Sequence, residues 1–409
     1  MNRYEKRVVF YSATAHAVIH MLELSYAAVL VILKVEFNSN LFLLGLVANL
    51  AAFAFGAGAL PAGVLSDKFG SKRIVMACLA TAGVTAVLVA VSPSIYMLAA
   101  SLTALGLAIG LYHPAGMSFI SRGVRQRSLG LGFNGVGGNI GVAFAPVFAA
   151  SVAALWGWRT SYLILAVLAF IILVTMLRVA PVREEEAPAE IARQAAAPAK
   201  ADVKVFYFTL IALYISYMFT GLIYRGAVTF LPAYIGERVE FAPLNNLSSV
   251  VKGGSFTTII LLFGVFGQYL GGYLSERMPI ERLLMPVALG LTPALFLMGA
   301  TSGLLLVIVA AVFAFCNFMG QPIYSSLIAK YTPHHWQGRS YGISYFATFG
   351  GGSFSAGLAG YIAQNQGINW VFFCLAGFGL PLIAVAIYVI WAASARTERT
   401  LVAERPGAA

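Results

Sequence analysis

Apolar residues form long runs along nearly the whole chain of 409 residues, and short segments rich in polar residues, Pro and Gly separate these runs. A run of about 20 apolar residues forms a helix long enough to cross a hydrocarbon core of ~30 Å. Helices also satisfy their own backbone hydrogen bonds inside lipid. The pattern therefore predicts a helical bundle with twelve membrane spans. The spans are expected at residues 8–32, 41–66, 73–92, 96–121, 128–155, 159–180, 205–234, 253–276, 283–301, 303–330, 340–363 and 369–393.

One segment has a different composition. Residues 181–202 are rich in Pro, Ala and charged residues and poor in aliphatic residues, as a solvated linker would be. Six predicted spans precede this segment and six follow it. We therefore expect an N-terminal six-helix half at 1–180, a cytoplasmic linker at 181–202, a C-terminal six-helix half at 203–395 and a cytoplasmic tail at 396–409.

Composition and charge placement also indicate a membrane protein. Hydrophobic residues make up 60% of the chain and charged residues 10%, whereas charged residues are about a quarter of a soluble domain. The net charge of +11 comes from Lys and Arg at the N-terminus, the even-numbered turns, the linker and the tail. The opposite side carries only Lys34, Arg159, Arg238 and Lys252. By the positive-inside rule we expect a multi-pass protein of the inner (plasma) membrane, in contact with the lipid bilayer, with both termini cytoplasmic and no nucleic-acid partner.

A charged turn occurs at equivalent places in the two predicted halves. The first copy is Gly63-Val-Leu-Ser-Asp67-Lys68-Phe-Gly70-Ser-Lys72-Arg73, and a weaker copy is Gly272-Tyr-Leu-Ser-Glu276-Arg277-Met-Pro-Ile-Glu281-Arg282. The first copy resembles the signature G-x-x-x-D-(R/K)-x-G-(R/K)-(R/K) between the second and third helices of the major facilitator superfamily. This resemblance implies an all-α membrane protein with twelve transmembrane helices in two pseudo-symmetric six-helix halves. It also implies a conformational gate made of Gly63, Asp67, Lys68, Gly70, Lys72, Arg73, Glu276, Arg277 and Arg282.

Two further motifs refine the resemblance. The run Gly141-Val-Ala-Phe-Ala145-Pro146-Val-Phe-Ala149-Ala150 is similar to the fifth-helix antiporter pattern G-x-x-x-G-P-x-x-G-G, with Ala at three Gly positions. Small residues let helices approach closely, so Gly141, Ala145 and Pro146 are expected to pack helices together. The runs Tyr112-His113-Pro114-Ala-Gly116 and Gly157-Trp158-Arg159 resemble the fosmidomycin-resistance group of prokaryotic efflux carriers. That group implies efflux of a solute against proton entry.

Glu23 and Arg225 are charged residues well inside predicted spans. Such a charge costs at least ~2.5–3.5 kcal/mol near a helix centre, so it marks a functional site. His16, His20 and Glu23 lie at i, i+4 and i+7 and share one face of the first span. A buried carboxyl group beside imidazoles is a candidate protonation site. Arg225 is expected to pair with Glu23 or with a solute carboxylate, or else to reach water or headgroups outside.

The resemblance further implies that the first, fourth, seventh and tenth spans line a central pathway. Polar residues occur on all four spans. The proton and substrate pathway is therefore expected to include His16, His20, Glu23, Tyr112, His113, Tyr217, Tyr224, Arg225, Asn317, Gln321 and Tyr324. The alternative for most of them is a purely structural hydrogen bond or packing contact between helices.

Other functions remain open from the sequence. His16, His20 and Glu23 also form a possible metal-ligand face, with His113 as the one evident further ligand. A divalent metal or an organic anion bound through Arg225 is therefore the alternative cargo, and an intramembrane metalloenzyme is a remote alternative. No nucleotide-binding P-loop motif occurs in the sequence. We expect a monomeric secondary carrier, neither an enzyme nor a holder of a cofactor or metal, that moves a small organic solute by alternating access with proton-coupled efflux.

Overall fold

The computed structural model describes residues 1–179, 203–240, 246–332 and 337–403. The predicted linker at 181–202 and residues 404–409 of the predicted tail lie outside these ranges. The described chain is helical and contains no strand. The first half contains α1 (Arg3–Glu36), α2 (Leu41–Phe69), α3 (Ser71–Ala90), α4 (Ile95–Gly110), α5 (Tyr112–Gly123), α6 (Arg127–Trp156) and α7 (Trp158–Met176).

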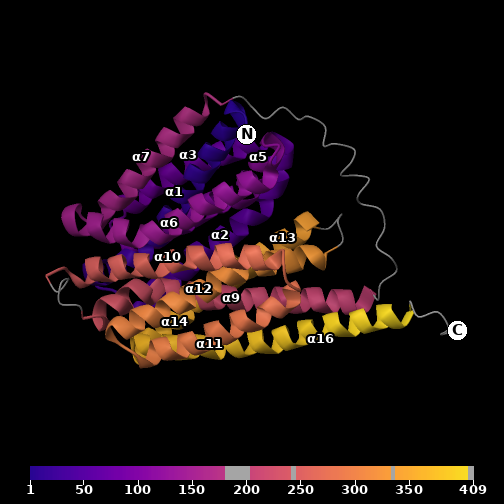
Figure 1. Ribbon diagram of the computed structural model, residues 1–409. Coiled ribbons are helices and arrows are strands. Elements are labelled where there is room, and N and C mark those ends of the chain that lie inside the picture. Colours follow the sequence, from indigo (N-terminus) through magenta and orange to yellow (C-terminus); the bar gives the residue numbers. More distant parts are fainter. Residues whose placement is uncertain (180–202, 241–245, 333–336, 404–409) are drawn as a thin grey trace.

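The second half begins with α9 (Val203–Arg238). It continues with α10 (Ser249–Ser275), η2 (Ile280–Leu283), α11 (Leu284–Ala300), α12 (Gly303–Lys330), α13 (Gln337–Tyr345), η4 (Phe346–Gly351), α14 (Phe354–Asn365), α15 (Ile368–Gly377) and α16 (Gly379–Ala403). Figure 1 shows the two halves as two layers, indigo to magenta above orange to yellow. Helix α16 continues to Ala403 and so extends into the predicted tail.

Two of the predicted spans are divided by proline. The fourth span is split into α4, which ends at Gly110, and α5, and the last span is split into α15, which ends at Gly377, and α16. Pro114 and Pro381 lie four residues after these two glycines. A proline ring clashes with the carbonyl group four residues earlier and removes a helical hydrogen bond. Both spans, at Ile95–Gly123 and Ile368–Ala395, are still among the 11 helical segments of the described chain that are long and apolar enough to span a membrane.

The predicted span at 340–363 is missing from those 11 segments because it is not one continuous helix. It consists of α13, the π-helical turn η4 and α14. Glycines let neighbouring backbones meet this turn: a Cβ atom on Gly56 of α2 would lie 2.5 Å from Gly350 N, and one on Gly352 would lie 2.6 Å from the carbonyl carbon of Gly221 in α9. With this broken segment the fold agrees with the predicted twelve-helix architecture.

The two halves pack tightly at one end of the bundle. There, α2 contacts α14 and α6 contacts α10. A Cβ atom on Gly45 would lie 2.4 Å from Ala356 O, and one on Gly254 would lie 2.6 Å from Pro146 O. In addition, Leu41 N donates to Gln364 Oε1 at 3.0 Å. This closed end lies where α2 begins and α14 ends, opposite the end that carries the charged turns.

Candidate functional site

A cavity of about 290 Å³ lies between the two halves. Its walls come from α1, α5 and α6 on one side and from α9, α10, α12, α13 and η4 on the other. The predicted pathway residues that line it are His16, His20, Glu23, His113, Tyr217, Tyr224, Asn317, Gln321 and Tyr324. The fold therefore brings most of the predicted pathway residues into one space.

Two histidines of α1 form part of a continuous hydrogen-bonded chain. Their Nε2 atoms lie 3.1 Å apart. His16 Nδ1 lies 2.9 Å from the backbone oxygen of Asn134, and His20 Nδ1 lies 2.8 Å from Glu23 Oε2. The helical spacing of the three α1 residues places them on one face, as predicted, and α6 supplies the far end of the chain.

A glycine makes room for the first imidazole of this chain. A Cβ atom on Gly138 of α6 would lie 2.4 Å from the His16 ring, and one on Gly141 would lie 2.3 Å from Ala17 O. On its other side the His16 ring stacks on Tyr112, with ring centroids 5.0 Å apart. The glycine-rich part of α6 thus lets α1 approach closely and also holds one functional side chain in place.

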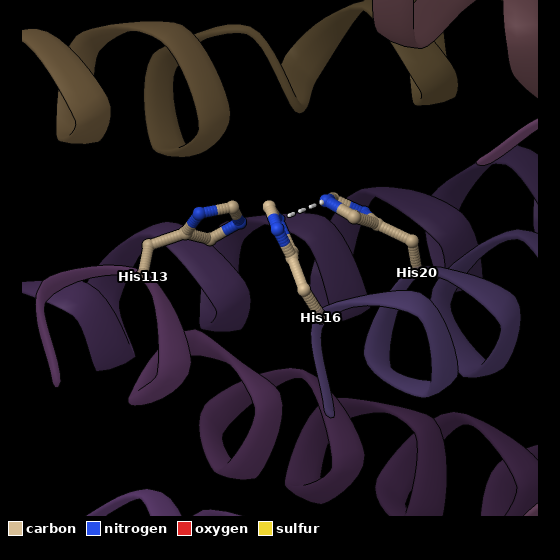
Figure 2. Close-up of side chains that lie close together, drawn as sticks. All are labelled: His16, His20 and His113. Atoms are coloured by element: carbon tan, nitrogen blue, oxygen red, sulfur yellow. Dashed lines mark hydrogen bonds between the residues drawn. The ribbon is translucent and has the colours of Figure 1, made fainter. Parts of the chain in front are cut away.

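His113 of α5 is the third imidazole of the cluster. Figure 2 shows the three rings side by side, with the dashed bond joining His16 and His20. The His113 ring centroid lies 5.0 Å from that of His16 and 5.4 Å from that of His20. His113 is 9% exposed, and its Nε2 atom has no hydrogen-bond partner among the described residues. This nitrogen is therefore a buried polar atom without a partner, on a residue of the cavity wall.

The expected contact between the two buried charges is present. Arg225 Nη2 donates to Glu23 Oε1, and the side chains are 9% and 8% exposed. The alternative expectation, in which Arg225 reaches the lipid headgroups outside, would require an exposed side chain, and this side chain is buried. Glu23 lines the large cavity and also a smaller pocket of about 40 Å³, which Arg225 lines from α9. The ion pair therefore separates the two spaces and joins the two halves of the protein.

Two predicted pathway residues do not line the large cavity. Arg225 lies behind Glu23, as described above. Tyr112 is fully buried, and its hydroxyl group lies 2.7 Å from Asn134 Oδ1 and 2.5 Å from Ser12 O. Tyr112 therefore lies against α1 and α6 and not in the cavity wall, at the point where the fourth span is interrupted between α4 and α5.

The second half supplies aromatic and neutral polar groups. Tyr217 and Tyr324 stack with ring centroids 5.1 Å apart, and the Tyr324 hydroxyl lies 2.5 Å from Ser216 Oγ. Tyr224 meets the edge of Phe318 at 5.8 Å. These contacts fix the orientation of the rings in the cavity wall.

Sequence reasoning did not single out some polar residues of the cavity. Asn134 anchors His16, and Asn139 Nδ2 donates to Gln268 Oε1 of the other half at 2.6 Å. Tyr345 stacks on His113 with centroids 5.7 Å apart. A signal for the two asparagines was present, because both interrupt the glycine-rich part of an apolar span.

The predicted gate residues lie at the end opposite the closed one. Gly70, with a φ of 87°, forms the turn between α2 and α3, and Lys72 Nζ donates to Val179 O at the end of α7. Lys68 lies 5.4 Å above the Phe69 ring. Gly63 is in α2 and Arg73 in α3, and the side chain of Asp67 lies outside the described part of the structure.

The second charged turn is held by an acid that was not among the predicted gate residues. Glu281 is buried and accepts hydrogen bonds from Lys330 Nζ at 2.7 Å and from the Tyr331 hydroxyl at 2.9 Å. By contrast, Glu276 and Arg282 are exposed, and Arg277 lies 3.9 Å above the Tyr273 ring. The contacts of this turn with α12 depend on Glu281.

A metal is a weaker fit to the histidine cluster than a proton. The ligand nitrogens of His16, His20 and His113 fall within 4.8 Å of one another. Neighbouring ligands of a tetrahedral zinc ion lie ~3.3 Å apart, given bonds of ~2.0–2.1 Å. The rings are gathered but not closed around an ion, whereas the two α1 rings already have the spacing of a hydrogen bond.

Comparison with known proteins agrees with this geometry. The sequence profile of the Major Facilitator Superfamily matches residues 13–356 and 254–408. The chain belongs to the major facilitator superfamily. Members of this superfamily are multi-pass membrane transporters of small solutes and not enzymes.

Individual relatives of this superfamily member are distant. A probable sulfoacetate transporter of Cupriavidus necator is 25% identical over 276 residues, which are 64% of this chain and 62% of that protein. The match therefore spans less than two thirds of the length of that curated relative. A D-xylose–proton symporter is 15% identical, with a TM-score of 0.78 over 94% of this chain and 97% of its own. A bacterial homolog of the human lysosomal transporter Spinster, inward-facing and occupied, is 13% identical, with a TM-score of 0.71 over 100% of both chains.

Proposed function

We propose that this protein is a secondary carrier that moves a small organic solute by alternating access and couples the movement to protons. The observation that supports this most strongly is the buried Glu23–Arg225 ion pair, which joins the two halves at the end of the cavity. Buried ionisable groups inside membrane spans are costly and typically mark ion or substrate pathways. The carboxylate is also bonded to His20, so its protonation would change a contact between the halves.

The sidedness of the cavity follows from charge placement. The cavity is closed where Leu41 meets Gln364, and the Lys- and Arg-rich turns, the start of α1 and the described end of α16 lie at the opposite end. The positive-inside rule assigns that opposite end to the cytoplasm. On this assignment the conformation is inward-facing, and the protein is a monomeric carrier of the inner membrane with cytoplasmic termini.

Two classes of organic solute suit the cavity. Asn317, Gln321 and the stacked Tyr217 and Tyr324 offer neutral hydrogen bonds and aromatic faces to a polar solute. A small organic anion is the second candidate, because the curated relative is named as a sulfoacetate transporter and Arg225 could exchange Glu23 for an anionic group. Efflux against proton entry is the direction implied by the fosmidomycin-resistance resemblance, and it stays a prediction.

The charged turns are proposed to act as the cytoplasmic gate between the halves at 1–180 and 203–395. Lys72 reaches the end of α7, and Glu281 holds Lys330 at the end of α12. Contacts of this kind favour one conformation over the other, because they form between ends of helices that move when the cavity opens.

The test is solute transport by purified protein in proteoliposomes with an imposed pH gradient, in both orientations. The probes are sulfoacetate, a panel of small carboxylates and neutral polar solutes, with zinc as the probe for the metal alternative. Glu23→Gln should abolish gradient-driven accumulation while solute exchange persists. The matched control is Glu36→Gln, since Glu36 is the acid at the other end of α1 and pairs with Arg159 at a partly exposed site. Wild-type accumulation by Glu23→Gln would place coupling elsewhere, and zinc uptake without solute uptake would favour the metal carrier.

A further inference from the structure

The hydrogen-bonded chain from Glu23 to Asn134 allows its protons to be counted. It contains three bonds: Glu23 Oε2 to His20 Nδ1, His20 Nε2 to His16 Nε2, and His16 Nδ1 to Asn134 O. Each bond needs one hydrogen between its two heavy atoms. Two neutral imidazoles supply one hydrogen each, and an ionised carboxylate supplies none. The three bonds need three hydrogens, whereas two neutral imidazoles and an ionised carboxylate supply two. The chain therefore contains one extra proton.

The positions of the three protons follow from the ends of the chain. The Asn134 carbonyl can only accept, so His16 donates to it from Nδ1. The extra proton then has three possible places. On His16 it makes this ring an imidazolium that also donates from Nε2 to His20. On His20 it makes that ring an imidazolium that donates to both Glu23 and His16, and on Glu23 it makes a carboxyl group that donates to His20 Nδ1.

The ion pair with Arg225 and the contact with His20 decide among these three places. The Arg225 guanidinium donates to the other carboxylate oxygen, Glu23 Oε1, and an arginine keeps its charge in a protein. A positive neighbour favours the ionised carboxylate, so the extra proton belongs to an imidazole. His20 lies 2.8 Å from that carboxylate, whereas the hydrogen bonds of His16 are to a carbonyl and to His20, so His20 carries the proton and donates from both ring nitrogens.

We propose that Glu23, His20 and His16 form a binding site for one transported proton and that the conformation described here is the loaded state. This inference rests on the proposed coupling to protons and names the group that carries the proton. In the unloaded state neutral His20 keeps its hydrogen on Nδ1, next to the Glu23 carboxylate. Its Nε2 lone pair then faces the lone pair of His16, so the bond between the two rings is lost and His20 turns away from His16.

The surroundings of the chain provide a route for the proton. The titratable and charged groups that face it are Tyr112 and His113 from α5, Tyr224 and Arg225 from α9, and, beyond His113, Tyr345 from α13. Among these, His113 has a ring nitrogen without a partner in the described structure and lies in the cavity wall beside His20. His20 itself also lines the cavity, so a proton reaches it from the cavity at a point bordered by His113.

The first measurement is ¹⁵N NMR of histidine-labelled protein in lipid nanodiscs, at acidic and alkaline pH. We expect His16 as the Nδ1–H tautomer and His20 protonated on both nitrogens in the loaded state, with loss of one proton and of the His16–His20 bond on raising the pH. In His16→Gln the amide oxygen still accepts from His20 and the amide nitrogen still donates to Asn134, so His20 should remain doubly protonated. A His16 ring with its hydrogen on Nε2, or a singly protonated His20 at every pH, would overturn the count.

The second measurement is transport in proteoliposomes under a pH gradient. A glutamine amide at position 20 has two hydrogens and can donate to both Glu23 and His16 without an extra proton. His20→Gln should therefore lose gradient-driven accumulation and retain solute exchange. Accumulation equal to wild type in His20→Gln overturns this inference alone, whereas a wild type that ignores the pH gradient overturns the proposed coupling. Stoichiometric zinc that remains in the purified protein after chelation would show that the histidine rings bind a metal and not a transported proton. This result would also overturn the inference.

Discussion

The two walls of the cavity differ in their chemistry. The first half contributes the three imidazoles and the Glu23 carboxylate, whereas the described cavity wall of the second half contains tyrosines and neutral amides and hydroxyls. Arg225 is a charged residue of the second half, but it does not line this cavity. It lies behind Glu23 and pairs with it there. Under the proposed function, this difference assigns proton handling to the first half and most of solute recognition to the second.

The two walls also differ in what must move. The histidine chain lies within one half and is held by close packing of α1 against α6 at Gly138 and Gly141. It can therefore stay intact when the halves rock against each other. The Glu23–Arg225 and Asn139–Gln268 contacts cross between the halves and have to break or rearrange. The proposed coupling thus depends on a proton site held within one half and attached to a contact that opens between the halves.

The largest effect is expected from substitution of Arg225, the charged residue of the second half that pairs with Glu23 of the first. Arg225→Ala removes one of the two cationic partners of the buried Glu23 carboxylate, the other being His20. Breaking a buried pair typically costs ~3–5 kcal/mol, and the remaining contact with His20 offsets part of this cost. We expect loss of coupled transport and a clear drop in the unfolding temperature of the detergent-solubilised protein. The double variant Glu23→Gln, Arg225→Gln should recover much of the stability but not the coupling. Equal stability of wild type and Arg225→Ala would mean that the pair does not connect the halves.

A second substitution tests the packing of the first wall. Gly138→Ala places a methyl group against the His16 ring, and overpacking of this kind costs ~1–3 kcal/mol. We expect a strong loss of pH-driven accumulation, measured in proteoliposomes, with the protein still folded. Gly132→Ala on the same helix is the control, because a Cβ atom there meets nothing within 4 Å. Similar defects in both variants would point to a general effect on α6.

The second wall should respond differently. Asn317→Ala removes a hydrogen-bonding side chain from the cavity, and a neutral hydrogen bond contributes ~0.5–1.5 kcal/mol. We expect the solute KM to rise by a few-fold, while the pH dependence of transport is unchanged. Initial-rate measurements at several pH values separate the two effects. A shift in the pH profile would break the proposed division between proton handling and recognition.

The smallest effect is expected at the charged turn. Lys72→Ala removes the bond to Val179 O at a partly exposed site, where charged contacts contribute ~0.2–1 kcal/mol. Turnover should fall modestly while KM stays within a few-fold of wild type. The control is Lys68→Ala, since Lys68 lies over its neighbour Phe69 rather than on another helix. A large KM change in Lys72→Ala would argue against a role in the gate.

The sequence was sufficient to predict features that depend on periodicity and on the cost of burying charge. Helical spacing places His16, His20 and Glu23 on one face, and the cost of two buried charges predicts the pairing of Glu23 with Arg225. The sequence did not predict which helix would lie behind that face. Asn134 and Gly138 act on His16 only because α6 packs there, and a spacing rule along one helix says nothing about its neighbour.

Helix breaks were also difficult to predict from hydropathy. Pro114 divides the fourth span, which sends Tyr112 into the core and His113 into the cavity, although both lie in the same apolar run. The π-helical turn at Phe346–Gly351 depends on glycines of α2 and α9 that approach it from other parts of the chain. Averaged hydropathy does not record either effect, because it measures composition and not direction.

The Glu23–Arg225 pair with its neighbouring histidine also has an electrical consequence. With the proton bound, Arg225, Glu23 and His20 together carry one positive charge, and without it they carry none. A membrane potential acts on a moving charge with ~2.3 kcal/mol per elementary charge per 100 mV. The step that carries the proton inward is therefore sensitive to voltage. In efflux against proton entry, export of a neutral solute moves one charge per cycle and export of a singly charged anion moves two, so current recorded during transport would report the charge of the solute.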